Sequence, residues 1–174
     1  MIINVDDFIR NNNEKLSLNF NENIEKIAYA DKVFELSSPM KIEGSIRKDK
    51  DLLYIVADVE FSIIDECSRC LEKINVPLKY KISGYLVEEK NYCEDEYEDN
   101  DAFVYSGNEI NLLDVIELTL DFNLPLKNLC KEDCKGLCTE CGANLNKGNC
   151  SCNEKVNDEV YIDPRFAKLK DLYK

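Results

Sequence analysis

Cysteines are the residues of this chain whose type and spacing are best suited to chemistry. The chain has nine of them, and six fall between residues 130 and 152. Their spacing runs Cys67-x2-Cys70, a lone Cys93, and then Cys130-x3-Cys134-x3-Cys138-x2-Cys141-x8-Cys150-x-Cys152. A C-x2-C turn places two thiolates on the same side of a tight loop, close enough to share one metal ion. The pattern predicts a metal site, and zinc is the expected ion because proteins often hold it by thiolates alone.

Eight of the cysteines can be divided into two sets of four, the number of ligands in a tetrahedral zinc site. The local set is Cys138, Cys141, Cys150 and Cys152, and the other is Cys67, Cys70, Cys130 and Cys134. Cys93 is left over. Alternatives remain open, because Cys130 and Cys134 are also spaced to lie on one helical face or to serve the local site. A single zinc with spare thiols also fits the spacing, whereas small buried hydrophobic residues are a poorer interpretation.

The composition excludes several classes of site. The chain has 174 residues, of which 44% are hydrophobic and 33% charged, so it is long enough to fold around a core. It contains no His, which excludes Ser-His-Asp and Cys-His catalysis and any zinc site with a His ligand. No apolar run is long enough for a membrane helix, and the N-terminal residues do not resemble a secretory signal. We therefore expect a cytoplasmic protein without a membrane partner, in a reducing compartment where clustered cysteines bind metal.

The charge of the chain is distributed unevenly. The formal net charge is -13, and residues 82–101 hold eight acidic residues and one Lys, whereas 40–81 and 130–152 are neutral. A protein that bound nucleic acid mainly by neutralising phosphates would show a basic excess, so no DNA partner is expected. The acidic stretch 88–101 is most simply a solvated loop, and a docking site for a basic partner is the alternative.

Alternating apolar and polar residues predict three consecutive strands. Apolar side chains occupy every second position over 40–46, 53–63 and 76–82, with a polar turn at 48–51 and the Cys67–Cys70 motif between the last two. Residues 16–20 show the same alternation over a shorter stretch. Short connections between consecutive strands favour an antiparallel β-meander or an open barrel.

A few short helices complete the predicted elements. Residues 111–124 fit a helix with Asn111 as its N-cap and Leu124-Pro125 at its end. Its apolar face comprises Leu112, Leu113, Ile116 and Leu120. A helix from Asp163-Pro164 to about residue 173 and a helical turn over residues 6–10 are also expected. The predicted fold class is α+β, with a β-rich core domain over 1–129 and a Cys-rich zinc-binding segment over 130–174.

The ordered motifs of the chain resemble those of one known family. They are Cys67-Ser68-Arg69-Cys70-Leu71, Leu124-Pro125-Leu126, the Cys-rich string from Cys130 to Cys152, and Asp163-Pro164-Arg165. Over nearly the whole chain they resemble the bacterial large ribosomal RNA subunit accumulation proteins, the YceD-like family. The resemblance implies a cytoplasmic protein associated with accumulation of the large-subunit RNA, and it implies no catalytic residues. Some family members lack the local C-terminal Cys four, which implies that this site is an accessory stabiliser.

We therefore expect a non-enzymatic ribosome-assembly factor with structural zinc, because closed four-thiolate sites leave no position for water or substrate. Its expected partner is a large-subunit precursor, contacted through ribosomal RNA or through a basic ribosomal protein. Candidate basic contacts are Arg47, Lys48, Lys50, Arg69, Lys79 and Lys81. The alternative function is a thiol-based redox switch or redox-regulated chaperone that uses Cys67 and Cys70. A hydrolase with paired carboxylates is disfavoured, because the acidic residues lack the apolar neighbours that raise a carboxyl pKa.

Overall fold

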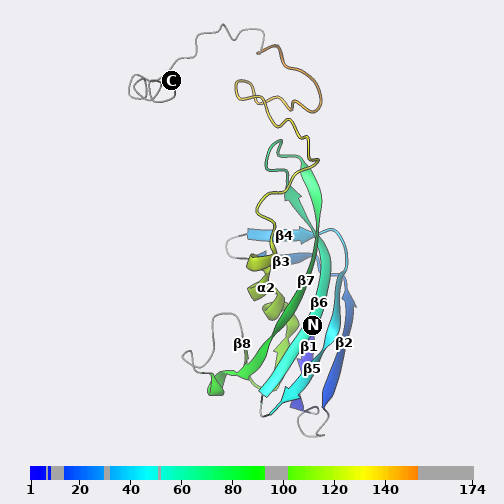
Figure 1. Ribbon diagram of the computed structural model, residues 1–174, viewed down its shortest axis with the longest axis vertical. Helices are drawn as coiled ribbons and strands as arrows, with labels where there is room; N and C mark the ends of the chain where they lie inside the picture. Colours follow the sequence, from blue (N-terminus) through cyan, green and yellow to red (C-terminus); the bar gives the residue numbers. More distant parts are fainter. Residues whose placement is uncertain (7, 9–13, 30–31, 51, 93–101, 153–174) are drawn as a thin grey trace, which may run out of the picture. The chain divides into compact units, whose positions relative to one another are not determined.

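Long antiparallel strands dominate the computed structural model of the chain, which describes residues 1–6, 8, 14–29, 32–50, 52–92 and 102–152. The three longest are β5 (Met40–Asp49), β6 (Leu52–Glu66) and β7 (Lys73–Glu88) (Figure 1). They include the three strands predicted from alternation, and each is longer than predicted. The predicted turn lies between β5 and β6, where Lys50 has a φ of 57°. A left-handed residue of this kind is typical of a tight turn.

These strands form the centre of a seven-stranded open sheet. β6 pairs along one edge with β7, and along the other with β5 and then with β4 (Lys32–Leu36). The sheet continues from β5 to β2 (Lys15–Glu22) and from β4 to β3 (Lys26–Tyr29). Every one of these pairs is antiparallel, whereas β8 (Ala102–Tyr105) pairs with β7 in parallel. The predicted α+β class with a mainly antiparallel sheet is therefore confirmed.

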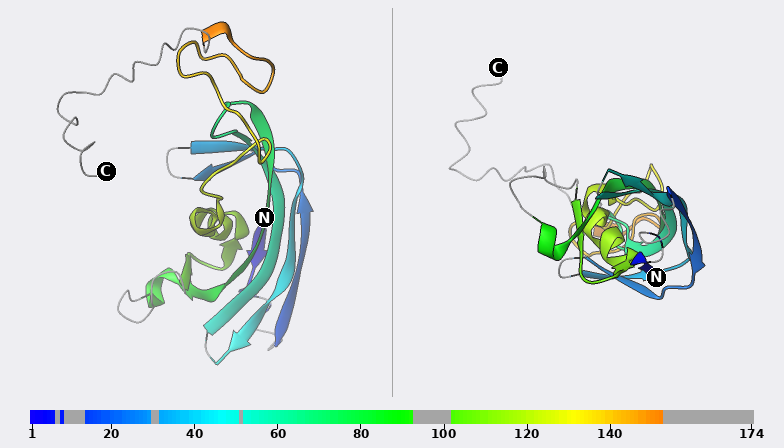
Figure 2. Two further views of the ribbon diagram at one scale, coloured as in Figure 1. Left: turned by 45° about the horizontal axis from the view of Figure 1, so that its top comes forward. Right: turned by 90° about the horizontal axis from the view of Figure 1, so that it is seen from below.

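One helix, α2 (Leu112–Asn123), lies in the hollow of the curved sheet (Figure 2). Asn111 is its N-cap as predicted, because its side chain accepts a hydrogen bond from the Leu113 N–H at 3.2 Å. The helix ends before Leu124, also as predicted. The short strands β1 (Ile2–Asn4) and β9 (Glu109–Asn111) pair with each other next to its start. The side chains that α2 buries are those of Leu112, Val115, Ile116 and Leu120.

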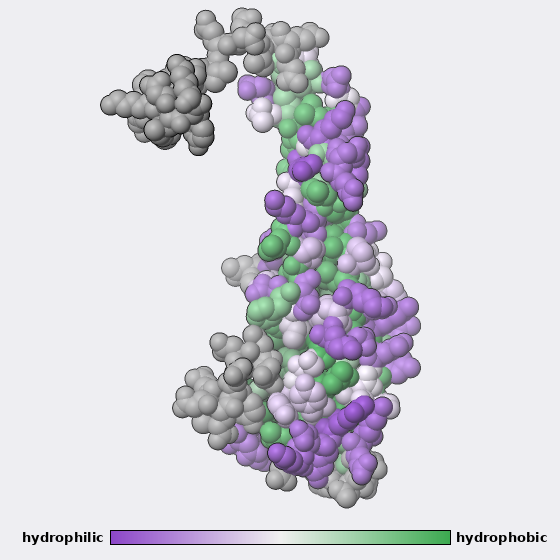
Figure 3. Space-filling model, in the orientation of Figure 1, coloured by the Kyte–Doolittle hydropathy of each residue, from purple (hydrophilic) through white to green (hydrophobic). Residues whose placement is uncertain are grey.

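The hydrophobic core lies between α2 and the inner face of the sheet. Ile55, Val59 and Ile63 of β6 are completely buried and lie four positions apart, on one face of the strand, because successive strand residues point to opposite faces. The outward rows carry charge instead, and hydrophilic side chains gather over β2, β5 and β6 (Figure 3). Lys79 of β7 pairs with Glu60 of β6, which raises the pKa of Lys79 through their hydrogen bond.

The chain divides into two compact units. Residues 1–68 and 72–130 form the first unit, which contains the sheet and α2. Residues 69–71 belong to the second unit, together with the segment that begins at Lys131. The described part of that segment consists of turns and irregular backbone, with one isolated β-bridge between Leu137 and Asn144. Within 131–152 the buried apolar side chains are those of Cys134 and Cys138, so this segment has almost no hydrophobic core.

Several short elements differ from the sequence predictions. β1, β3, β4, β8 and β9 were not predicted as separate strands, and a 3-10 turn at Glu89–Asn91 begins the predicted acidic loop. Asp6 and Phe8 are helical, but the rest of the predicted turn at 6–10 lies outside the described residues. The same holds for the predicted helix from residue 163, for Cys93 and for the acidic residues 94–101. None of the described helices has the length and apolarity that crossing a bilayer requires.

Gly44 of β5 pairs with Ala57 of β6 and leaves no room for a side chain, so we expect an alanine there to be strongly destabilising. A Cβ at this position would collide with the carbonyl oxygen of Val56 and the Cα of Ala57, which are backbone atoms of a central strand. We expect Gly44→Ala to lower the free energy of unfolding in urea by about 3 kcal/mol, the upper end of the range for overpacked sites. Gly107→Ala is the control, because open space surrounds Gly107 and only its positive φ is strained, at about 1 kcal/mol. Equal losses in the two variants would contradict this steric explanation.

Candidate metal centres

The structure brings eight cysteine sulfurs into two groups of four. The sulfur atoms of Cys67, Cys70, Cys130 and Cys134 lie within 4.8 Å of one another, and so do those of Cys138, Cys141, Cys150 and Cys152. None of these eight cysteines forms a disulfide. In a tetrahedral zinc site with Zn–S bonds of about 2.3 Å, neighbouring sulfurs are about 3.8 Å apart. Both groups therefore fit a zinc ion in ligand type, ligand number and spacing.

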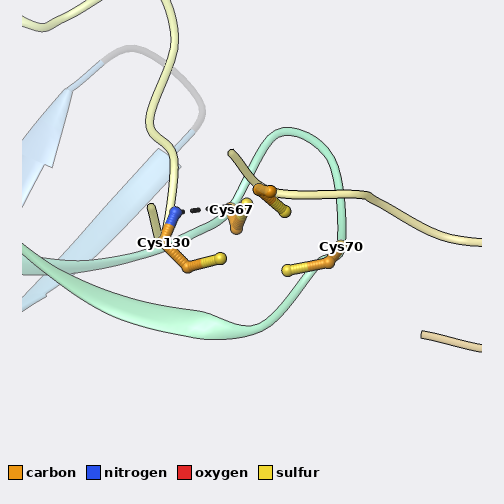
Figure 4. Close-up of side chains that lie close together, drawn as sticks. Cys67, Cys70 and Cys130 are labelled. Atoms are coloured by element: carbon orange, nitrogen blue, oxygen red, sulfur yellow. Dashed lines mark hydrogen bonds between the residues drawn. The ribbon is translucent and has the colours of Figure 1, made fainter. Parts of the chain in front are cut away.

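The first C-x2-C motif forms the connection between β6 and β7. β6 ends at Glu66, and the Cys67 N–H donates a hydrogen bond of 2.9 Å to the carbonyl oxygen of Glu72 as the chain returns. Leu71 completes the turn with a φ of 59°. The sulfur atoms of Cys67, Cys70 and Cys130 point toward one another (Figure 4). The motif thus takes the place of an ordinary hairpin loop, as the spacing predicts.

A segment far along the chain is fastened beside Cys67 by Asn128. The backbone N–H of Ser68 donates to the Asn128 carbonyl at 2.7 Å, and the Asn128 N–H donates to the Ser68 Oγ at 3.2 Å. The Asn128 side chain also donates to Asp65 at 2.5 Å. These bonds position Cys130, whose N–H donates to the Cys67 sulfur at 3.4 Å. A donor of this kind stabilises thiolate charge, which is the ionised form that a metal requires.

The predicted alternatives for Cys130 and Cys134 can be compared with this geometry. Residues 130–134 are not helical, so the two cysteines do not share a helical face. Their sulfurs group with Cys67 and Cys70 and not with the local set. Asn146 donates from its Nδ2 to the Cys134 sulfur at 3.3 Å, a further contact that favours a charged sulfur.

The second C-x2-C motif forms a tight turn closed by Gly142. The Gly142 N–H donates to the Cys138 carbonyl at 2.9 Å, and the Cys138 N–H donates to the Ala143 carbonyl at 2.8 Å. Gly142 has a φ of 72°, a conformation that glycine adopts without strain. The backbone N–H groups of Cys141 and Glu140 hydrogen-bond to the Cys138 sulfur and lower its pKa to about 7.

Crowding raises the pKa of Cys150 and Cys152 in the same group, which is opposite to the effect on Cys138. The hydrogen bond with Cys141, followed by burial and the nearby Cys138 and Cys150 sulfurs, raises the pKa of Cys152 to about 12. Each thiolate in the group disfavours ionisation of its neighbours because like charges repel at this distance. A bound cation removes that conflict, and thiolate sulfur is a preferred ligand of zinc.

Arg69 stands at the tip of the first motif, and its hydrogen bonds lie within the second unit. Its guanidinium donates to the carbonyl oxygen of Cys134 at 2.9 Å, and its own carbonyl accepts from the Leu137 N–H at 3.2 Å. Gly136 lies against it, because a Cβ there would be 3.1 Å from the Arg69 oxygen. Its position in the sequence makes Arg69 a candidate RNA contact. The structure gives it a part in holding the loop that carries Cys134.

Asn128 and Asn146 are the residues that sequence reasoning missed. Asn128 bonds to Ser68, 60 positions away, and Asn146 bonds to Cys134, 12 positions away within the same loop segment. No spacing rule marks such a residue, because isolated asparagines are common in loops. The basic candidates Lys79 and Lys81 are in ion pairs with Glu60 and Asp58, so part of their charge is offset within the sheet.

Comparison with known proteins identifies relatives of this chain. The family described as large ribosomal RNA subunit accumulation protein YceD matches residues 55–173, which include all eight grouped cysteines and α2. An uncharacterized protein of Mycobacterium tuberculosis is 25% identical over 118 residues, covering 68% of this chain and 54% of that protein. An uncharacterized protein of Mycobacterium leprae is 24% identical over 140 residues, covering 80% of this chain and 62% of its own length.

One of the relatives carries a descriptive name. It is the large ribosomal RNA subunit accumulation protein YCED homolog 1, chloroplastic, of Arabidopsis thaliana, which is 25% identical over 150 residues. That alignment covers 71% of this chain and 47% of the plant protein. The chain thus spans only about half to three fifths of the length of these relatives. No solved structure matches it.

Proposed function

Because the chain belongs to the YceD family of large ribosomal RNA subunit accumulation proteins, we propose that it promotes accumulation of large-subunit ribosomal RNA during ribosome assembly. In this proposal the chain is a cytoplasmic, non-enzymatic factor whose loops are held by zinc. Residues 1–129 supply the β-rich body, and residues 130–174 supply the Cys-rich segment. The partner is a large-subunit precursor, reached through its RNA or through a basic ribosomal protein. The family match over residues 55–173 is the observation that carries the proposal.

The structural role of zinc is supported by where the grouped cysteines lie. Within 131–152 the buried apolar side chains are only those of two cysteines, so packing alone gives this segment little stability. In small loops of this kind a bound metal supplies the folding free energy that a hydrophobic core supplies elsewhere. Four thiolates complete the coordination of zinc and leave no open position for a reacting water. This supports a structural ion in each group and no hydrolytic role.

The redox alternative rests on Cys67 and Cys70 alone, and their surroundings favour metal binding. Reactive dithiols are partially exposed, because the attacking sulfur must reach its target. Cys67 is 0% exposed and Cys70 is 4% exposed. Two further thiols, those of Cys130 and Cys134, lie within 4.8 Å of them. A four-sulfur arrangement is typical of a structural metal site, not of an isolated redox pair.

Depletion of the chain from its native cell tests the proposed function. We expect the ratio of large-subunit to small-subunit ribosomal RNA to fall, and the tagged chain to co-sediment with large-subunit precursors in sucrose gradients. Re-expression of the wild-type chain should restore the ratio. An unchanged RNA ratio, with the tagged chain confined to particle-free fractions, would overturn the proposal.

A further inference from the structure

The outward face of α2 carries two large apolar side chains that the core does not use. Leu118 is 61% exposed and Phe122 is 68% exposed. They are four residues apart, so they lie on the same side of the helix, one turn from each other. Leu120 is completely buried on the opposite side. A contiguous exposed apolar surface is a candidate contact surface for another molecule.

These side chains line a formed groove between α2 and β3. The groove has a volume of about 510 Å³, and its lining includes Ala28 and Tyr29 of β3. Glu117 accepts a hydrogen bond from the Ala28 N–H at 3.2 Å, which fastens the helix to the strand. Tyr29 is hydrogen-bonded to Asp121 across the same groove. The two walls are therefore held together before any partner arrives, which lowers the entropic cost of binding.

The rim of the groove is acidic. Asp114, Glu117 and Asp121 line it, and no Lys or Arg is among its described lining residues. α2 itself contains no basic residue. A carboxylate rim repels phosphate groups and attracts Lys and Arg side chains, so it disfavours RNA and anionic lipid as occupants. An apolar strip with such a rim fits an amphipathic helix, with its apolar face in the groove and its basic residues on the rim.

We propose that the α2–β3 groove binds a basic amphipathic segment of a partner protein, with Leu118 and Phe122 as its apolar contacts. The acidic rim of the groove favours a basic partner, and the overall charge of -13 adds long-range attraction. The inference rests on the proposed function only in placing this partner on a ribosomal precursor. If the groove fails to bind, the depletion experiment above still decides the proposed function by itself.

Binding of two synthetic peptides tests the groove. Both contain about 18 residues of Lys and Leu, enough for five helical turns. One places Leu at the i, i+3, i+4 spacing of an amphipathic helix, and the other has the same composition in alternating order. The two peptides carry the same charge, so non-specific attraction to an acidic protein is matched. We expect the full chain to bind the helical pattern roughly tenfold more tightly, a difference of about 1.4 kcal/mol.

Substitutions in the groove separate the contribution of its apolar side chains to binding from that of its acidic rim. Leu118→Ser and Phe122→Ser should abolish the preference for the helical pattern while leaving the fold intact, because both side chains are exposed. Glu117→Gln should weaken binding of the helically patterned peptide at low salt, because it removes a negative charge from the rim. The side-chain amide oxygen of Gln can still accept the hydrogen bond from the Ala28 N–H. Ile2→Ser is the matched control, since Ile2 is 63% exposed and lies outside the groove.

Several results would overturn the proposal. They are equal affinity of the chain for the two peptides, absence of binding to both peptides, and a Phe122→Ser variant that still prefers the helical pattern. Tighter binding of a single-stranded RNA of similar length would also overturn it in favour of a nucleic-acid surface. Concentration-dependent self-association of the wild-type chain that Phe122→Ser removes would instead assign the groove to a second copy.

Discussion

Cys141→Ser is expected to reduce the zinc content of the purified chain from about two ions to about one. Cys141 belongs to the group with Cys138, Cys150 and Cys152, and its removal leaves that group with three sulfurs. Zinc bound by three thiolates has an open position and is held less tightly than in a closed site. The measurement is metal content per chain by mass spectrometry, on protein purified under reducing conditions.

Two further variants show whether the two groups are separate sites. Cys67→Ser should also leave about one zinc per chain, because it disrupts the other group only. Cys93→Ser is the matched control and should retain the full zinc content, since Cys93 belongs to neither predicted set. The Cys67 variant should unfold at lower urea concentration than the Cys141 variant. Cys67 is completely buried at the end of the longest-paired strands, whereas Cys141 is exposed in a turn.

The zinc result also decides between the proposed and alternative functions. One zinc in the parent chain, lost only in Cys141→Ser, would leave Cys67 and Cys70 as free thiols and would favour the redox alternative. Absence of metal from every sample with intact thiols would overturn the zinc assignment altogether. With about two ions bound, removal by a chelator should make residues 131–152 sensitive to protease while the sheet stays resistant, because that segment lacks an apolar core.

The sequence predicts the strands correctly where apolar residues alternate along a single long segment. Period-two alternation located β5, β6 and β7, because each buries one face along most of its length. It did not reveal β3 or β8, which have four residues each, too few for alternation to stand out. The parallel pairing of β8 with β7 joins residues 102–105 to residues 85–88, and no local pattern in the sequence encodes it.

Cysteine spacing likewise predicts which cysteines lie together, because the spacing within a short loop is a local property of the sequence. The predicted division into two sets matches the two groups that the structure brings together, although their service as metal ligands stays a prediction. Short loops explain this success, since C-x2-C and C-x-C restrict which sulfurs can meet. The supporting contacts of Asn128 and Asn146 depend on residues from distant parts of the fold or loop, so spacing alone did not identify them.

Two leucines on α2 provide the strongest test of which face of the helix supports the fold. The predicted apolar face included Leu120 and left Leu118 outside it, and the structure buries the first completely and exposes 61% of the second. Leu120→Ala removes a side chain from the packed core between α2 and the sheet, so we expect it to lower the free energy of unfolding by about 2–5 kcal/mol. Leu118→Ala makes the same chemical change on the same helix and should cost less than about 0.5 kcal/mol.

Urea unfolding of the two variants measures the difference in unfolding free energy that comes from burial, because the change in helix propensity is the same in both. Leu118→Ala should weaken binding of the helically patterned peptide while leaving the unfolding midpoint near that of the wild type. Leu120→Ala should move the midpoint and, at urea concentrations where it remains folded, keep the peptide preference. Comparable losses of stability in the two variants would mean that Leu118 is packed in solution, and the groove that it lines would then not be open to a partner.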